Sequence, residues 1–321
     1  MTPAPRARVA RRPVHGVLLL DKPLGMSSNQ ALQKAKWLLR AEKAGHTGTL
    51  DPLASGLLVI CFGAATKFSQ LHLDADKAYD ALLRLGTTTT TADAEGSVVQ
   101  TRDLPEADID LQALADRFTG RIGQMPPMYS ALKKDGKALY DYARAGEVVE
   151  REVRQVDIHA LKLQWATTSA DHAALEAQVR CSKGTYIRTL AQDIGEAMGC
   201  GAHLGALRRV AAGSFQLAQC ITLQALESMA DSDRENALLP VVSLLQDLAS
   251  IHLDEPESAR FLSGLPRRGS WPDTPLLSVY GPGDVLLGTG RVEAGQLHPV
   301  RLLNTDEIQE MTQTSVNAVT A

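Results

Sequence analysis

The sequence predicts an α+β protein whose chain ends in a small β-rich module. Apolar runs of strand length, at 16–20 and 57–62, alternate with segments at 27–39 and 187–194 that have the apolar period of helices. After about residue 249 the strand-like runs are short and are separated by glycines. With 321 residues and 44% hydrophobic content, the chain can form one large domain or two unequal ones.

Composition narrows the classes of function. No apolar run approaches the roughly 20 residues that span a bilayer, and the basic tail at 1–14 lacks the apolar segment of an export signal, so we expect a cytoplasmic protein without a membrane anchor. The four cysteines are too far apart for a zinc site, the eight histidines form no His-x-x-x-His pair, and the glycine motifs that bind phosphate or dinucleotides are absent. We therefore expect neither a metal nor a cofactor.

The first elements lead to one conspicuous loop. A strand at 16–20 and a turn at 21–26 precede a helix that begins at a capping box formed by Ser27 and Gln30 and continues to about residue 39. The loop that follows, residues 45–56, reads GHTGTLDPLASG, and its three glycines permit sharp bends and close approach of a ligand. The apolar run at 57–62 predicts a buried strand that anchors this loop.

Asp51 is the only acidic residue in that loop. Pro52 fixes its own φ and favours an extended conformation for Asp51, so the carboxylate is held in one direction. Asp51 then either caps a turn, as Asp commonly does, or serves as a fixed reactive acid.

The middle of the chain combines structural elements with a basic insertion. We expect a strand from Tyr79 to residue 86, with the Tyr79 ring either in the core or facing a cleft, then a polar loop at 87–96 and a helix at 111–118. Residues 121–154 begin with prolines, carry seven Lys and Arg against five acids and include three tyrosines. Cations and aromatic rings together suit RNA, by neutralising phosphates and stacking on bases. Strands at 156–165 and 173–181 complete this part.

The polar stretch at 181–188 passes from a strand through Gly184 into a helix. Tyr186 and Arg188 therefore lie at the start of the helix, and polar junctions between a strand and a helix often face a site. A glycine-rich turn at 199–204 leads to Leu207, and an acidic, helical linker at 222–248 precedes the final module.

The net charge is −4, but residues 1–15 hold four arginines and no acid, and 180–210 hold five cations against two acids. These basic stretches are either solvated faces or an RNA surface.

Five segments in the same order resemble the bacterial tRNA pseudouridine-55 synthases, the TruB family, from about residue 16 to 209 and more weakly to the end. They are DKPLGMSS at 21–28, GHTGTLDPLASG at 45–56, KAY at 77–79, YSALK at 129–133 and CSKGTYIR at 181–188. The resemblance implies the pseudouridine synthase fold, a mixed, largely antiparallel sheet flanked by helices. It also implies a catalytic domain at 15–248 with a thumb insertion at about 121–154, a PUA-like RNA-binding domain at 249–305 and a flexible tail at 306–321.

The activity implied by the resemblance is the isomerisation of uridine 55 in the T loop of tRNA, without a cofactor, by a monomer. Asp51 matches the family's nucleophile, which acts on a flipped-out base; attack at C6 of the base and at C1′ of the sugar both remain open. Arg188 matches the arginine that pairs with the nucleophile, and a nearby cation favours the ionised carboxylate.

Other matched positions line the expected RNA site. Tyr79 matches the tyrosine that stacks on the flipped base, Tyr186 a tyrosine that helps to move the C5 proton, and Leu207 an apolar contact to the base. His46 matches a histidine that contacts RNA beside the flipped nucleotide. Lys22 matches a lysine with a structural or RNA-contacting role, and Lys133 and Lys183 are further possible RNA contacts.

Two alternatives remain open at this stage. The basic insertion and the final module also suit an RNA-binding or RNA-folding factor without catalytic activity. A hydrolase that uses Asp51 has less support, because the sequence shows no second carboxylate at a useful spacing.

Overall fold

The computed structural model describes the backbone of residues 10–104, 109–130, 132–147, 149–167 and 173–319, and side chains as far as residue 313. Within these residues the largest sheet has ten strands. Their bounds are β1 (Gly16–Lys22), β2 (Ala44–His46), β3 (Ala54–Phe62), β4 (Lys77–Leu85), β7 (Gly120–Gln124), β10 (Arg154–Trp165), β11 (Ala174–Cys181), β12 (Ala202–Ala212), β13 (Phe215–Gln216) and β14 (Ile221–Thr222).

The strands lie in the order β14-β1-β3-β12-β4-β11-β10-β7, with β2 beside β3 and β13 beside β12. Among the described residues only the β1–β14 and β3–β12 pairs of this sheet are parallel. The mixed, largely antiparallel sheet predicted from the resemblance is therefore confirmed. The helices are α1 (Ser28–Leu38), α2 (Ser69–Leu73), α3 (Leu111–Arg117), α4 (Leu139–Arg144), α5 (Ile187–Ala197), α6 (Leu223–Ser228), α7 (Glu255–Leu262) and α8 (Thr305–Val319).

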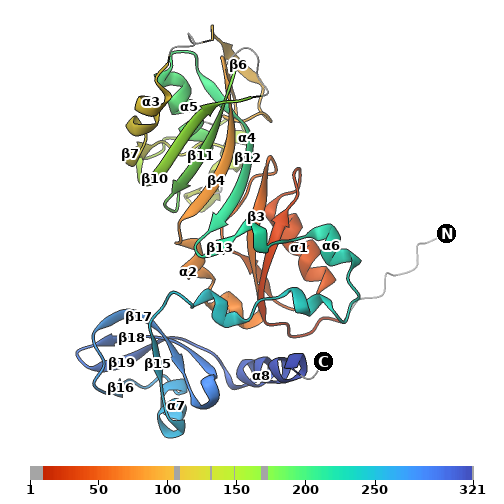
Figure 1. The fold of residues 1–321 in the computed structure, drawn as a ribbon, viewed down its shortest axis with the longest axis vertical. Helices are drawn as coiled ribbons and strands as arrows, with labels where there is room; N and C mark the ends of the chain where they lie inside the picture. The colour runs from red at the N-terminus through yellow and green to blue at the C-terminus, as the bar shows by residue number, and fades with distance from the viewer. Residues whose placement is uncertain (1–9, 105–108, 131, 148, 168–172, 320–321) are drawn as a thin grey trace, which may run out of the picture.

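Figure 1 shows three lobes stacked along the long axis of the molecule. The upper lobe contains β7, β10 and β11 with α3 and α5, the middle lobe contains β1 and β3 with α1 and α6, and β4 and β12 connect the two. The middle lobe begins as predicted: Gln30 N donates to Ser27 Oγ at 3.2 Å, and Ser27 N donates to Gln30 Oε1 at 2.8 Å. This capping box satisfies free backbone donors at the start of α1.

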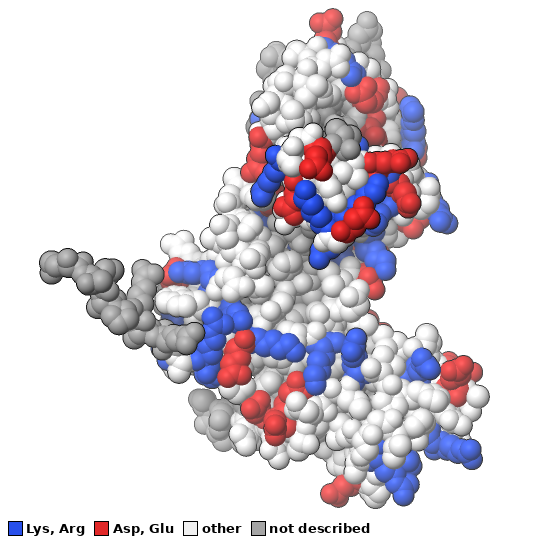
Figure 2. Space-filling model, turned by 180° about the vertical axis from the view of Figure 1, so that it is seen from behind, with Lys and Arg blue, Asp and Glu red and all other residues white. Residues whose placement is uncertain are grey.

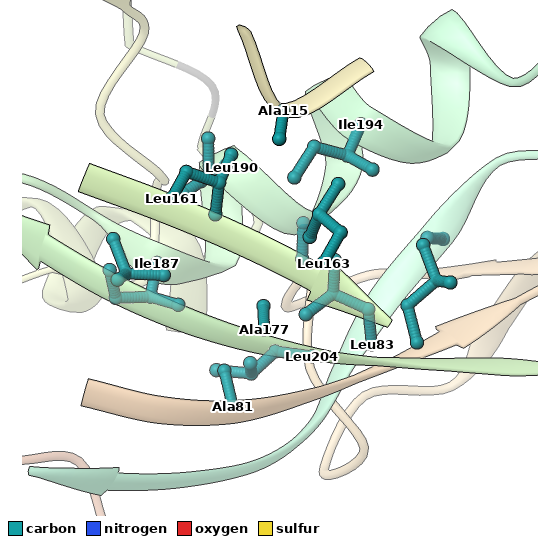
Figure 3. Packing of buried hydrophobic residues seen from close by; sticks show 14 of the residues in the cluster. Ala81, Leu83, Ala115, Leu161, Leu163, Ala177, Ile187, Leu190, Ile194 and Leu204 are labelled. Carbon is teal, nitrogen blue, oxygen red and sulfur yellow. The ribbon is translucent and has the colours of Figure 1, made fainter. Parts of the chain in front are cut away.

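Helix α5 is fixed to the sheet by its apolar face. Ile187, Leu190, Ala191 and Ile194, the positions that the 3.6-residue period predicts, are all buried. In Figure 3 they meet side chains of β4, β10, β11, β12 and α3, among them Leu83, Leu161, Leu163, Ala177, Leu204 and Ala115. The packing holds the first residues of α5, including Arg188, at the edge of the sheet.

Three segments differ from the sequence predictions. The expected polar loop at 87–96 contains a strand, β5 (Thr87–Thr89), which pairs with β6 (Val98–Thr101), because β-branched threonines also suit strands. Strand β12 was not predicted beyond the turn at 199–204. Register shifts at 204/206 and 209/211 interrupt its two-residue alternation, so its sequence lacks the usual signal.

The third segment is the end of the chain, where the described residues form α8; the flexibility expected for 306–321 stays a prediction. Glu307 N donates to Asn304 Oδ1 at 2.7 Å, which caps the helix start, and Ile308 and Met311 pack against buried residues of the middle lobe. A polar sequence can still form a helix when a few apolar residues dock on a neighbouring core.

The final module is β-rich, as predicted. Its strands are β15 (Ser250–His252), β16 (Arg267–Arg268), β17 (Thr274–Tyr280), β18 (Leu286–Glu293) and β19 (Gln296–Leu302). They lie in the order β15-β17-β18-β19-β16 around their own apolar cluster.

A small hairpin, β8 (Lys133–Lys134) and β9 (Lys137–Ala138), precedes α4 in the basic insertion. None of the helices described is long and apolar enough to cross a membrane.

Candidate active site

The loop that carries Asp51 joins β2 to β3 and is tied to the first residue of α1 and to the turn before it. The buried Ser28 hydroxyl donates to Leu50 O at 2.9 Å and accepts from Leu50 N at 2.7 Å. On the other side of Asp51, Gly25 N donates to Pro52 O at 2.8 Å. These bonds fix the backbone immediately before and after Asp51, so the carboxylate projects from a rigid support.

Arg188, in the first turn of α5, meets this carboxylate. Its Nη2 lies 3.0 Å from Asp51 Oδ2 and also donates to Tyr129 O at 2.7 Å, while Nη1 donates to Thr91 O at 3.2 Å. Only 6% of the Arg188 side chain is exposed, against 42% for Asp51. The bonds to two backbone carbonyls restrict the movement of this guanidinium, which presents its positive charge to an accessible carboxylate.

Asp93 is a second carboxylate at this centre, and the sequence reasoning missed it. Its Oδ2 lies 3.5 Å from Arg188 Nη1, and 4% of its side chain is exposed. Thr91 Oγ1 and Glu95 N donate to Asp93 Oδ1, at 2.5 and 3.1 Å. The sequence predicts only a polar loop at 87–96; an acid flanked by hydroxyl and amide donors is the signal that points to Asp93.

Opposing effects act on the pKa of Asp51. Burial raises the pKa of the Asp51 carboxyl above its ordinary value of 3.8, and the charge of Asp93 adds to this rise. Arg188 and Lys22 oppose it by favouring the ionised form. The pairing that the sequence predicted is present, but it counteracts burial and does not produce an unusually acidic group.

The predicted aromatic and apolar residues border the same region. Tyr79 on β4 and Leu207 on β12 are both half-buried against the core of the upper lobe. Burial raises the pKa of the phenols of Tyr79 and Tyr186, so both stay protonated at neutral pH. Burial also lowers the pKa of His46, at the end of β2, so its imidazole is neutral there.

Gln124 is a further residue that sequence reasoning missed. Its buried amide brackets Tyr186: Nε2 donates to Tyr186 O at 3.3 Å, and Oε1 accepts from Tyr186 N at 3.0 Å. Thr189, which follows Arg188 in α5, donates from Oγ1 to Met125 O at 3.2 Å. Together with the Arg188–Tyr129 bond, these contacts attach the start of the basic insertion to the helix that presents Arg188.

The three predicted lysines have different surroundings. Lys22 is fully buried, and its ammonium donates to the carbonyls of Pro23 and Met26. These contacts support a structural role for Lys22 over a role in contacting RNA. Burial lowers its pKa to about 8. Lys183 is exposed and pairs with Asp74 at 2.9 Å, and Lys133 is exposed on β8. The last two can reach a polyanion without rearrangement of the core.

Models of known families match most of the chain. Residues 36–187 match the TruB family pseudouridylate synthase N-terminal domain, 188–247 the tRNA pseudouridylate synthase B C-terminal domain, and 249–303 the C-terminal domain of pseudouridine synthase II TruB. The chain is 57% identical to the tRNA pseudouridine synthase B of Verminephrobacter eiseniae, over 97% of this chain and 95% of the relative. It is also 57% identical to that of Cupriavidus metallidurans, over 92% and 96%.

Solved structures with the same fold are more distant in sequence. An H/ACA ribonucleoprotein bound to a substrate RNA containing 2′-deoxyuridine contains a chain with a TM-score of 0.68 and 22% identity, covering 92% of this chain and 86% of the other. A chain of a Cbf5-Nop10-Gar1 complex gives a TM-score of 0.67 at 25% identity, covering 92% and 87%. The first of these likenesses supports the fold alone.

Proposed function

The chain belongs to the TruB family of pseudouridylate synthases, and from this premise we propose that it isomerises uridine 55 in the T loop of tRNA with Asp51 as the nucleophile. As a member of this family it is a tRNA pseudouridine synthase, an isomerase. The single observation that carries the proposal for Asp51 is its accessible carboxylate, held by a rigid loop 3.0 Å from a buried arginine.

The chemistry requires a base outside its stack. In this isomerisation the C1′–N1 bond breaks, the uracil turns within the site, and C5 forms the new bond to C1′ as its proton leaves. A base in a folded RNA loop must first flip out, at a cost of a few kcal/mol. Stacking on Tyr79 recovers about 1–3 kcal/mol of this cost. The open side of Asp51 suits such a large substrate.

We assign the remaining roles from this arrangement. Arg188 keeps Asp51 ionised against burial, and Leu207 supplies an apolar contact to the flipped uracil. Tyr186 helps to move the C5 proton; because its phenol is neutral, it accepts this proton only as its own proton passes on to N1 of the uracil, which is protonated in the product. His46, which is neutral, contacts the RNA beside the flipped nucleotide. Lys133 and Lys183 bind phosphates.

The proposed domain roles follow the same premise. Residues 15–248 form the catalytic domain, in which 121–154 act as a thumb on the RNA, and 249–305 form a PUA-like domain that assists RNA binding. The protein acts as a monomer in the cytoplasm, without a metal or cofactor. Binding to RNA without catalysis remains the competing function for the basic insertion, and the experiment below separates the two.

The test compares wild-type protein with Asp51→Asn on an unmodified T-loop RNA, using tritium release from C5-labelled uridine and mapping of pseudouridine. We expect the variant to lose at least about 1,000-fold in rate and to bind the RNA as wild type does. Asp116→Asn, at an exposed position of α3, controls for the loss of one carboxylate.

Four results would contradict parts of this proposal. Tritium release by Asp51→Asn at the wild-type rate would exclude Asp51 as the nucleophile. Modification at a uridine other than 55 would exclude the site assignment. Binding by the wild type without tritium release would leave only the RNA-binding function, and free uracil would indicate a hydrolase.

A further inference from the structure

Arg209 of β12 is the largest fully buried side chain among the residues that the structure describes, with 1% of its surface exposed. It lies in the strand that joins the two halves of the sheet, opposite Tyr79 of β4 and Gly56 of β3. A guanidinium keeps its charge in a protein, and a buried charge is costly unless polar partners surround it. The mechanism described above does not use this residue.

The partners of Arg209 lie in the Asp51 loop and in the strands beside it. Its Nε donates to Leu57 O at 2.7 Å, in the strand that follows the Asp51 loop, and its Nη2 donates to Gly48 O at 3.2 Å, inside that loop. Arg209 also lies directly opposite Tyr79 in the β12–β4 pair, and the charge of its guanidinium lowers the pKa of the Tyr79 phenol, against the larger rise caused by burial. Among the ion pairs of the described residues, none includes Arg209.

The fork of the guanidinium therefore connects two groups that must act on one nucleotide. One is the loop that carries Asp51, and the other is the ring of Tyr79. They come from different strands, and β12 lies between those strands. A displacement of about 1 Å between reacting groups can cost about 100-fold in rate.

We propose that Arg209 is a positioning residue that holds the Asp51 loop and the Tyr79 ring in a fixed relation before RNA binds. This inference rests on the roles proposed for Asp51 and Tyr79. Arg209 acts through these groups and does not touch the substrate, since it is buried beneath them. Its two backbone acceptors are bound by different nitrogens of the guanidinium, so a lysine, with a single ammonium, cannot keep the whole set of contacts.

Lys77 provides a matched comparison. It is also a buried cation, with 7% exposure, on the neighbouring strand β4. Its ammonium donates to the carbonyls of His72, Leu73 and Ala75, at the end of α2, and to none in the Asp51 loop. Removal of either cation disturbs a buried polar cluster, but only Arg209 is bonded to the loop.

The experiment compares Arg209→Lys and Lys77→Met with the wild type. Hydrogen–deuterium exchange of the free proteins tests the structural claim without any assumption about activity. We expect faster exchange in peptides covering 45–52 for Arg209→Lys, and in peptides covering 69–76 for Lys77→Met. Single-turnover rates on the T-loop RNA test the functional claim: Arg209→Lys should be about 100-fold slower with an unchanged Kd, and Lys77→Met should keep the wild-type rate at temperatures where it is folded.

Tyr79→Phe gives a second route if the buried variants fail to fold, because it keeps the ring and removes only the hydroxyl. We expect faster exchange at 45–52 there as well. Unchanged exchange at 45–52 in the folded variants, or a full rate for Arg209→Lys, would overturn the inference. An inactive wild type that still showed the exchange pattern would contradict the proposed function and leave the positioning contact supported.

Discussion

At the scale of single residues, the site depends on competition between burial and charge at Asp51. Arg188 is held by the carbonyls of Thr91 and Tyr129 and by two carboxylates, so its position does not depend on Asp51 alone. Asp93 both orients this arginine and repels the negative charge of Asp51. The pair Asp51–Arg188 is thus one part of a three-residue centre.

The first prediction concerns the pH dependence of the rate. Attack requires an ionised Asp51, and the pKa of this carboxyl is raised by burial and by Asp93, against the charges of Arg188 and Lys22. The rate should therefore rise with pH along an acid limb whose midpoint lies above 3.8, the ordinary value for aspartic acid. Single-turnover rates from pH 4 to 8 measure it, with circular dichroism to show that the protein stays folded; a rate that stays flat down to pH 4 would contradict the prediction.

The second prediction concerns Asp93→Asn. Arg188 loses one of its two carboxylates and shifts, which should slow the plateau rate about 100-fold. Asp51 loses a neighbouring negative charge, so its pKa falls and the acid limb moves to lower pH. Single-turnover pH profiles of wild type and variant measure both effects. If the rate falls but the acid limb of the pH profile does not move, Asp93 supports the structure without influencing the pKa of Asp51.

At the scale of elements, close contacts between backbones place the site. Gly56 begins the buried part of β3 with φ +99°, and a Cβ there would lie 2.3 Å from Arg209 O. Only glycine lets β3 approach β12 so closely and adopt this conformation. The glycines of the 45–56 loop thus do more than admit a ligand: Gly56 joins β3, the strand that follows the Asp51 loop, to β12.

We expect Gly56→Ala to destabilise the protein by at least about 2 kcal/mol, since the new methyl group collides with backbone and the residue keeps an unfavourable φ. Gly45→Ala is the matched control, because no atom lies within 4 Å of its added Cβ and its φ is ordinary. Urea unfolding at neutral pH compares the two variants with wild type. Equal stability of the two variants would show that β3 and β12 can separate without cost.

At the scale of the whole molecule, the module at 249–305 is fixed to the catalytic lobes by the helix that follows it. Glu307 of α8 binds Lys67, which also donates to Leu302 O, and Ile308 packs on the middle lobe. Figure 2 shows a row of Lys and Arg side chains across the back of the molecule, where the middle lobe meets this module. The net charge of −4 conceals this local basic surface.

We therefore expect the affinity for T-loop RNA to fall at least about 10-fold between about 50 and 200 mM salt, because phosphate contacts release counterions. Lys133→Gln should reduce the slope of log Kd against log salt by about one unit. Lys67→Gln should leave it unchanged, since that ammonium is already bound within the protein. Fluorescence anisotropy measures all three proteins, and a flat salt dependence would exclude a phosphate-binding surface.

The sequence by itself determined most elements and the identity of the central acid. Strand periods, the Ser27 capping box and the apolar face of α5 depend on residues only a few positions apart, and these are confirmed. The segment around Asp51 was conspicuous because glycine, proline and one acid stand together. The roles of Asp51 and the residues around it remain predictions.

Only the tertiary structure decided which side chains meet. Asp93 reaches Arg188 from a hairpin taken for a loop, Gln124 brackets Tyr186, and Arg209 joins the Asp51 loop to Tyr79 through a strand whose bulges conceal it. These partners lie far apart in sequence, and no local pattern records their contacts. They are brought together by sheet register and by the need of buried polar groups for partners.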